Sequence, residues 1–174
     1  MSFTVRPVRA DELDSAFEVI EEGRRAIAAL GIDQWQNGSP SRETISNDIV
    51  NQRLYGAYDE AGLCAVCALC GGIEPYYLKI EGKWLTDGPY ITIHRMAARR
   101  RARHAGAAAA LLTEAERIAR ASGILSLRAD THRGNAVMQR FMDKNGFANC
   151  GITDYTPQIT GCDPIRIVYE KRLE

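Results

Sequence analysis

The sequence has no excess of charge of either sign and no long apolar run. Its 22 Lys and Arg residues balance 22 Asp and Glu residues. Domains that bind nucleic acid are usually basic, because neutralised phosphates supply most of the affinity. No segment approaches the roughly 20 apolar residues of a membrane helix, and the opening MSFTVRPVRADELD lacks the pattern of a signal peptide. We therefore expect a cytoplasmic protein with neither a nucleic-acid nor a membrane partner.

Cysteine is scarce and its number, five, is odd. Without a secretory signal this favours free thiols over a disulfide framework. Cys64, Cys67 and Cys70 have the C-x-x-C-x-x-C spacing of part of an iron–sulfur run. They lie, however, in an apolar run of strand length, GLCAVCALCGG, where residues three apart should face opposite sides. We expect buried structural cysteines and no metal, with an iron–sulfur protein as the open alternative.

The composition, 45% hydrophobic and 25% charged, is that of an ordinary globular protein, and we expect one domain over residues 1–174 without internal repeats. Hydrophobic periodicity and turn residues predict the order β, α, α, β, β, β, α, β, α, β, β. The expected helices are 11–30, 40–51, 106–121 and 135–144, and the expected strands are 3–8, a hairpin within 54–72, 90–98, 124–131, 146–153 and 165–173. We expect Asp11 to cap the first helix, and Ser39 and Pro40 to begin the second. The predicted class is α/β or α+β with one mixed sheet.

A strand, turn and helix around Gly106 carry the clearest functional signal. The strand 90–98, the helix 106–121 and the strand 124–131 predict a right-handed crossover, and ligands bind at the carboxyl end of the first strand of such a unit. The turn there reads RRRARHAGAAAALL from residue 99. Gly106 would let a ligand approach the main chain, and the free N–H groups at a helix start favour a diphosphate. The turn is neither a Walker loop nor a G-x-G-x-x-G motif.

Two motifs in this half of the chain resemble those of the GNAT superfamily of N-acyltransferases. Residues 103–108, RHAGAA, match the signature R/Q-x-x-G-x-G/A, and residues 135–147 resemble the N-x-x-A-x-x-L-Y-x-K-x-G-F segment. The resemblance extends over most of the chain. YITIHRMA, RADTH and GFANCGI are further similar to a bacterial subgroup with H-R-x-A, D-T-H and G-F-x-x-C-G-I motifs.

The resemblance implies a mixed sheet of about seven strands flanked by about four helices, with acetyl-CoA as cofactor. It implies an N-acetyltransferase that moves an acetyl group to a primary amine of a small molecule or peptide by direct attack in a ternary complex. The implied cofactor-binding residues are Met96, Ala97, Ala98, Arg103, His104, Ala105, Gly106, Ala107, Ala108, Asn135, Met138, Met142 and Lys144. A main-chain amide of Met96 or Ala98 would bind the thioester oxygen. Arg99, Arg100 and Arg101 would reach the 3′-phosphate or form a solvated turn.

Catalysis needs a group that takes a proton near neutral pH, and imidazole titrates in that range. We expect His94 to be the base, with His132 as a second candidate and Asp130 orienting a histidine or binding a cation. In the alternative, these side chains and Arg95 form a polar network that only joins two strands. The tyrosine that usually protonates the leaving thiolate falls on Met142, which cannot donate a proton.

Tyr90 is the replacement donor that we consider for Met142. The same methionine keeps open a catalytically silent acyl-CoA sensor, a second class of function. The acceptor pocket is expected to include aromatic and charged side chains, which suit an amine by stacking or charge. These candidates are Trp35, Glu74, Tyr77, Trp84 and Arg95. Such residues are as often core or homodimer contacts.

Overall fold

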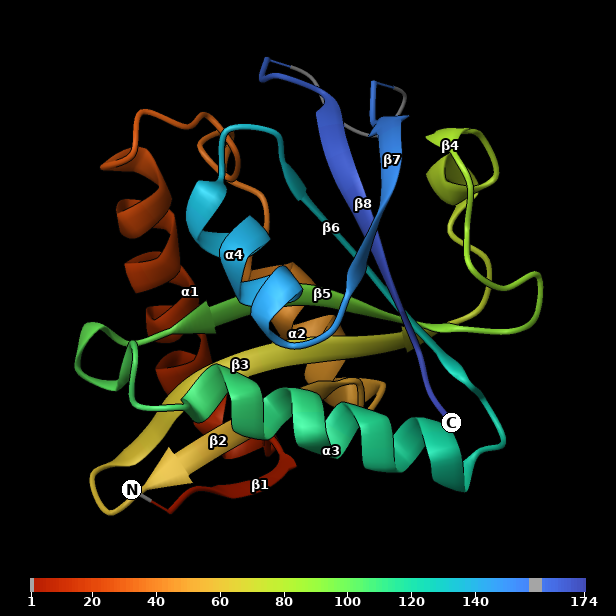
Figure 1. Ribbon diagram of the computed structural model, residues 1–174. Coiled ribbons are helices and arrows are strands. Elements are labelled where there is room, and N and C mark those ends of the chain that lie inside the picture. Colours follow the sequence, from red (N-terminus) through yellow and green to blue (C-terminus); the bar gives the residue numbers. More distant parts are fainter. Residues whose placement is uncertain (1, 157–160) are drawn as a thin grey trace.

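The computed structural model describes residues 2–156 and 161–174. It contains one mixed sheet in the order β1-β2-β3-β5-β6-β8-β7-β4 (Figure 1). The strands are β1 (Thr4–Pro7), β2 (Leu54–Asp59), β3 (Gly62–Gly71), β4 (Ile80–Gly82), β5 (Ile91–Ala98), β6 (Ser126–His132), β7 (Ala148–Asp154) and β8 (Ile165–Arg172). The expected hairpin is β2–β3. The prediction of about seven strands missed β4, three residues in a loop, which pairs with β7 where the sheet would otherwise end.

In the described part of the chain, four α-helices cover the two faces of the sheet: α1 (Leu13–Ala28), α2 (Arg42–Val50), α3 (Ala107–Ala121) and α4 (Ala136–Lys144). Helices α1 and α2 lie on one face, and α3 and α4 on the other (Figure 1). The apolar side of α1, which includes Val19 and Ile20, packs in one core cluster. Leu111 and Ala115 of α3 pack in the other. The mixed α/β fold predicted from the sequence is confirmed.

Two helix starts differ from the prediction. Asp11 lies within a 3₁₀ turn, Ala10–Glu12, and α1 begins at Leu13. The Glu12 carboxylate accepts a hydrogen bond from the main-chain N–H of Arg9 at 2.9 Å, which holds this turn ahead of the helix. Helix α2 is capped by Ser41, whose hydroxyl accepts from the Thr44 N–H at 3.1 Å, so Ser39 and Pro40 precede the helix.

The cysteines of β3 do not alternate as expected. Cys64 and Cys67 both pack in the cluster that contains α3, whereas Cys70 packs in the opposite one. The reason is a register shift against β2 between Ala57 and Tyr58, which inserts an extra residue near Cys64 and cancels one step of alternation. Within residues 2–156 and 161–174, no three or more His, Cys, Asp or Glu side chains are placed to hold a metal ion. None of the described helices is long and apolar enough to cross a membrane.

The sheet opens between β5 and β6. These two parallel strands pair only over Ile91–Ile93, opposite residues 127–129. From His94 onward β5 stays paired with β3, while β6 continues along β8 to His132. A second register shift places Arg95 and Met96 of β5 opposite a single β3 residue, and Arg95 has a φ of 55°. The fold thus leaves an unpaired strand edge beside a bulge in the middle of the sheet.

Candidate active site

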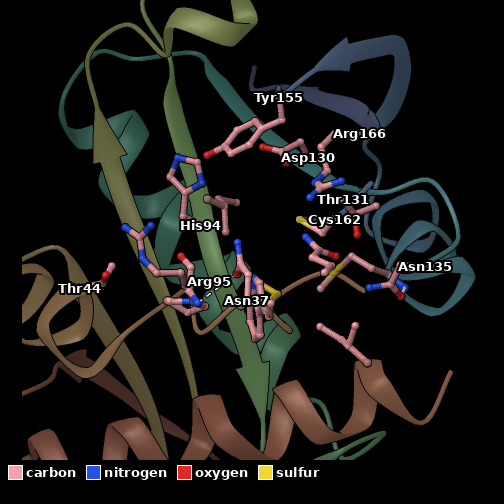
Figure 2. Close-up of a pocket in the computed structure, with 18 of the residues that line it drawn as sticks. Asn37, Thr44, His94, Arg95, Asp130, Thr131, Asn135, Tyr155, Cys162 and Arg166 are labelled. Atoms are coloured by element: carbon pink, nitrogen blue, oxygen red, sulfur yellow. Dashed lines mark hydrogen bonds between the residues drawn. The ribbon is translucent and has the colours of Figure 1, made fainter. Parts of the chain in front are cut away.

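A cavity of about 150 Å³ lies where β5 and β6 separate (Figure 2). Its walls come from β5, β6 and β8, from one side of α4, from the connection between α1 and α2 together with one residue of each of these helices, and from residues on either side of 157–160. His94, Arg95 and Met96 contribute from β5, and Asp130 and Thr131 from β6. Residues far apart in the sequence therefore line one cavity.

His94 and Glu74 form a close pair at this cavity. The His94 Nε2 lies 2.7 Å from the Glu74 Oε1, and both side chains are mostly buried. The bond from His94 lowers the pKa of the Glu74 carboxyl, so this group is ionised at neutral pH. The main-chain N–H of Glu74 donates to the Tyr90 hydroxyl at 2.9 Å, which fixes the loop that carries the carboxylate. The sequence suggested Glu74 as an acceptor contact and gave no sign that it would meet His94.

Arg95 is held by a carboxylate that sequence analysis missed. Its Nε and Nη2 donate to the two oxygens of Asp48 at 2.6 and 3.0 Å. Asp48 is 4% exposed although it lies on α2, where a charged residue would be expected to face solvent. This bidentate pair neutralises Arg95 and ties α2 to the bulge of β5.

Asp130 faces the cavity from β6 and is held by a tyrosine. The Tyr77 hydroxyl donates to its Oδ1 at 2.7 Å. Burial raises the pKa of Asp130, while the neighbouring His94 and the bond from Tyr77 act in the opposite direction. Tyr77, expected in the acceptor pocket, is instead a buried support for this carboxyl.

His132 belongs to a different cluster and does not line the cavity. Its Nδ1 accepts from the Gly134 N–H at 2.9 Å. Its Nε2 lies 3.3 Å from a carboxylate oxygen of both Asp33 and Asp163. Burial is the main cause that lowers the pKa of His132. The structure therefore separates the two histidines that the sequence offered as bases: His94 faces the cavity and His132 joins two loops behind it.

Two other aromatic candidates also lie outside the lining of the cavity. Trp84 and Tyr90 stack on opposite sides of Arg128, with its Cζ 4.0 and 4.1 Å from their ring centroids. The Trp84 indole N–H donates to the main-chain oxygen of Tyr77 at 3.0 Å. Trp35, in contrast, does line the cavity, and so does Tyr155, which sequence analysis overlooked.

The turn before α3 has room for a ligand and unpaired donors. Gly106 caps the helix with a φ of 98° and no side-chain cap. A Cβ at this position would meet one atom, in the Phe3 ring at 3.9 Å, so the space above the turn is open. The first N–H groups of α3, from Ala107, have no carbonyl partner within the helix. These features fit a diphosphate. The Ala105 N–H, expected to bind the cofactor, instead donates to the main-chain oxygen of Ala102 within the turn.

The arginines of this turn are mostly engaged with the protein itself. Arg103 donates to the main-chain oxygens of Ala98 and Glu22, at 3.2 and 3.0 Å, and so braces the turn against β5 and α1. Arg99 pairs with two glutamates of α1, and Arg101 pairs with Asp59. Of the three arginines expected to flank a phosphate, Arg100 has the one guanidinium without a hydrogen bond among the described residues.

The implied cofactor residues of α4 divide into two groups. Asn135 caps the helix by accepting from the Met138 N–H at 3.1 Å, and both residues line the cavity with Met142. Met142 is 2% exposed. Lys144 lies at the exposed end of α4, away from the lining.

Comparison with known proteins agrees with this geometry. The model of the acetyltransferase (GNAT) family matches residues 32–147. The chain is 28% identical to the spermidine N(1)-acetyltransferase of Thermoplasma acidophilum, over 84% of this chain and 89% of that protein. Among solved structures it is similar to a GNAT-family acetyltransferase of Streptococcus agalactiae, with 32% identity, a TM-score of 0.83, and coverage of 99% of this chain and 96% of the other. It is also similar to the PaiA N-acetyltransferase of Thermoplasma acidophilum in complex with coenzyme A, with 25% identity, a TM-score of 0.70 and 99% coverage of each chain.

The family match covers more than half of the chain and includes the separated strands, the turn at Gly106 and the start of α4. Members of this family use acetyl-CoA, and the open turn with its unpaired helix amides suits the diphosphate of that molecule. The protein belongs to the acetyltransferase (GNAT) family and is an acetyl-CoA-dependent N-acetyltransferase.

Proposed function

We propose that the protein acetylates a primary amine of a small molecule or peptide by direct attack in a ternary complex. The observation that supports this most is His94, which lines the cavity at the unpaired edge of β5 and is paired with Glu74. His94, the half-buried carboxyl group of Asp130 and the C-terminal half of β5 lie together at this cavity.

His94 is proposed to take the proton of the amine. Glu74, which is ionised, can only accept a hydrogen bond, so Nε2 of His94 carries a proton in this pair. In the neutral ring this leaves the lone pair on Nδ1. A neutral amine is needed for attack because an ammonium group has no lone pair. Asp130 is proposed to attract the cationic form of the acceptor into the cavity.

Acetyl-CoA supplies the activated acetyl group when it is bound. The amides of Gly106, Ala107 and Ala108 are proposed to bind its diphosphate, with the turn braced by Arg103. Met96 to Ala98, which have no partner strand on the β6 side, leave main-chain groups available for the rest of the cofactor. Arg100 is the arginine of this turn that remains available for a further phosphate.

Cys162 is the cysteine that could support a covalent route, because it is the one cysteine that lines the cavity. The others are buried, and burial raises the pKa of the Cys67 thiol to about 12. Direct attack predicts that Cys162→Ala keeps turnover within about threefold of wild type. Loss of activity in this variant, with an acetylated enzyme detected by mass spectrometry of the wild type, would contradict the ternary-complex route.

The cofactor site is tested by titrating acetyl-CoA into wild type, Gly106→Trp and Gly123→Trp in a calorimeter. Gly123 is the matched control, because it lies at the other end of α3, has positive φ and meets nothing within 4 Å. Losing several charge-assisted hydrogen bonds should weaken binding to Gly106→Trp by at least about 100-fold. Gly123→Trp should bind normally. Equal binding by all three proteins would remove the turn from the proposal.

Turnover is tested by measuring CoA release and acetylated product over a panel of amines, amino acids and peptides. Met142 favours the one alternative that we retain, a protein that binds acyl-CoA without efficient transfer, because its thioether cannot donate a proton. Tight acetyl-CoA binding without product from any acceptor would support that alternative.

A further inference from the structure

Arg166, on β8, is a buried cation that lines the same cavity. It is 4% exposed. Its Nη1 donates to the main-chain oxygens of Asp163 and Ile165 at 2.6 and 3.1 Å. Among the described residues, its Nε and Nη2 make no hydrogen bond, so two of the three guanidinium nitrogens have no assigned role.

No carboxylate oxygen of the described residues lies within 4.0 Å of an Arg166 nitrogen. Residues 157–160, outside the description, read PQIT and contain no carboxylate side chain. Other arginines of the described residues that are shielded from solvent differ. Half-buried Arg95 is bound by Asp48, and buried Arg128 lies 3.4 Å from Glu170. Burying a charge without an ionic partner is unfavourable, so an anion bound in the cavity would stabilise Arg166.

Contacts within the fold do not account for this arginine. Its Cζ is 5.8 Å from the Tyr155 ring centroid, at the outer limit of a cation–π contact. In the β6–β8 register Arg166 lies opposite His132, and Asp130 lies two residues farther along β6. Asp130 accepts a hydrogen bond from Tyr77, and the charge of Arg166 is one of the causes that lower the pKa of Asp130. The two side chains nevertheless form no ion pair within 4.0 Å. The hydrogen bonds from Arg166 to the main-chain oxygens of Asp163 and Ile165 use only its Nη1. A neutral donor could make them equally well, so they do not explain a charged side chain here.

The two sides of the cavity differ in what they can bind. His94 approaches it from β5, and Asp130 and Arg166 approach it from the opposite side (Figure 2). A base and a carboxylate suit an amine, and a guanidinium edge with two free donors suits a planar anion. Because His94, Asp130 and Arg166 line one and the same cavity, a single small molecule can reach both sides.

We infer that the acceptor carries a carboxylate as well as its amine, and that Arg166 binds this carboxylate through Nε and Nη2. The acceptor class is then small aminocarboxylic acids. This inference rests on the proposed acetyl transfer to an amine at His94. A polyamine such as spermidine would bring a second cation toward Arg166, so this chain should disfavour the compound named for its Thermoplasma relative.

The test compares acceptors that differ in one carboxylate: L-lysine with cadaverine, L-ornithine with putrescine, and 4-aminobutyrate with propylamine. For wild type, at least one acid should react with a kcat/KM about 10- to 100-fold above that of its decarboxylated partner, the range for a hydrogen-bonded charge pair. Equal rates within all three pairs, a preference for the diamines or spermidine, or turnover restricted to peptides would overturn the inference. This comparison needs no variant.

Variants locate the effect at Arg166. Arg166→Gln should abolish the advantage of the acid, so that the acid and its decarboxylated partner react with similar kcat/KM. Arg166→Lys should restore part of it, because it keeps the charge without the planar fork. Arg172→Gln, on the same strand but exposed, is the control and should match wild type. An acid preference that persists in a folded Arg166→Gln, as judged by its melting temperature and acetyl-CoA affinity, would overturn the assignment.

Binding separates this inference from the proposed function. Calorimetry of 4-aminobutyrate and L-lysine is carried out with wild type and Arg166→Gln in the presence of CoA. Charge-dependent binding that is lost in Arg166→Gln, without acetylated product, would support the carboxylate site and contradict acetyl transfer to these amines. Product formed equally from acids and amines would support acetyl transfer and overturn the carboxylate site.

Discussion

The Nε2 of His94 and the Oε1 of Glu74 meet at 2.7 Å although the two residues come from different segments. His94 lies on β5, just where its pairing with β6 has ended, and Glu74 lies in the loop after β3. The Tyr90 hydroxyl accepts the main-chain N–H of Glu74, so the strand and the loop are fixed relative to each other. This arrangement sets the proton position of the proposed base.

We predict that the two histidines have separable effects. His94→Gln should lower kcat about 10²- to 10⁴-fold with an added amine, the usual contribution of a positioned general base. His132→Gln should keep kcat within about threefold, because His132 lies outside the lining of the cavity. The measurement is the pH dependence of kcat and kcat/KM for wild type and both variants. Full activity with an unchanged pH profile in His94→Gln would rule His94 out as the base.

We predict that His132 affects the pH dependence of the free energy of unfolding. Its folded pKa is lowered, mainly by burial, so below about pH 6.5 the unfolded chain binds a proton more readily than the folded one. The free energy of unfolding contributed by this residue should therefore fall as the pH drops below that value, and should be constant above it. Urea denaturation at pH 7.5 and pH 5.5 should show a smaller pH effect in His132→Gln than in wild type. The same difference in both proteins would be inconsistent with a buried neutral His132.

The Tyr76 and Tyr77 rings pack together, with centroids 4.8 Å apart. Removing the hydroxyl of each in turn tests the role of the hydrogen bond to Asp130. The Tyr77 hydroxyl donates to Asp130, whereas the buried Tyr76 hydroxyl makes no hydrogen bond to Asp130 and lies instead beside Tyr155 and Glu74. Removing the bond in Tyr77→Phe should raise the pKa of Asp130 further, because hydrogen bonding favours the ionised form. The acid limb of kcat/KM should move to higher pH in Tyr77→Phe and stay in place in Tyr76→Phe. Identical profiles would show that ionisation of Asp130 does not govern acceptor binding.

Glu12 should stabilise the N-terminal strand and helix in a pH-dependent way. Arg6 donates to both of its oxygens at 2.8 Å and Tyr58 donates at 3.0 Å, which lowers the pKa of Glu12 to about 2. Because the folded pKa lies below the unfolded value of about 4.3, the stabilisation is complete above that pH and is lost as the pH falls toward 2. Allowing for solvent screening, we expect Glu12→Gln to lose about 1–2 kcal/mol of unfolding free energy at pH 7.

The comparison for Glu12 is urea denaturation of wild type and Glu12→Gln at pH 7 and pH 3. The difference between the two proteins should shrink at the lower pH. Glu60→Gln, at an exposed turn, serves as the control and should differ little from wild type at either pH. A difference that is independent of pH would mean that packing rather than charge accounts for the effect.

The parts of the site that follow one continuous segment could be predicted from the sequence. The turn at Gly106 is an example. Its conformation depends only on a glycine between a strand and a helix, and the N–H groups at the start of that helix are the donors. The N-cap of α4 at Asn135 is local in the same way. His94 was found because it lies on the strand that ends at this turn.

The contacts between distant segments could not be predicted in this way. Asp48 lies in the predicted helix 40–51, where nothing in the sequence marks it as buried, and its burial follows from the bulge that turns Arg95 toward α2. Arg166 lies in the predicted strand 165–173, and its place in the cavity depends on where β6 separates from β5. A single sequence contains neither the bulge nor the separation, because both depend on pairing between strands.

The Glu170 side chain is fully buried on β8. Ser126 and Thr86 donate their hydroxyls to it at 2.5 Å, the Leu85 N–H donates at 2.5 Å, and the Arg128 Nε lies 3.4 Å away. Burial alone would raise its pKa, but these donors outweigh burial and lower it.

Removing this carboxylate should leave Arg128 buried without its ionic partner. We expect Glu170→Gln to lose about 3–5 kcal/mol of unfolding free energy at neutral pH, the usual effect of breaking a buried pair. The wild-type advantage should decline as the pH falls through the folded pKa, because that pKa lies below the unfolded value. Urea denaturation between pH 7 and pH 3, with exposed Glu81→Gln as control, measures both effects. A loss below about 1 kcal/mol would show that water or a rotated Arg128 compensates, and that the loop at Leu85 is held by its aromatic contacts instead.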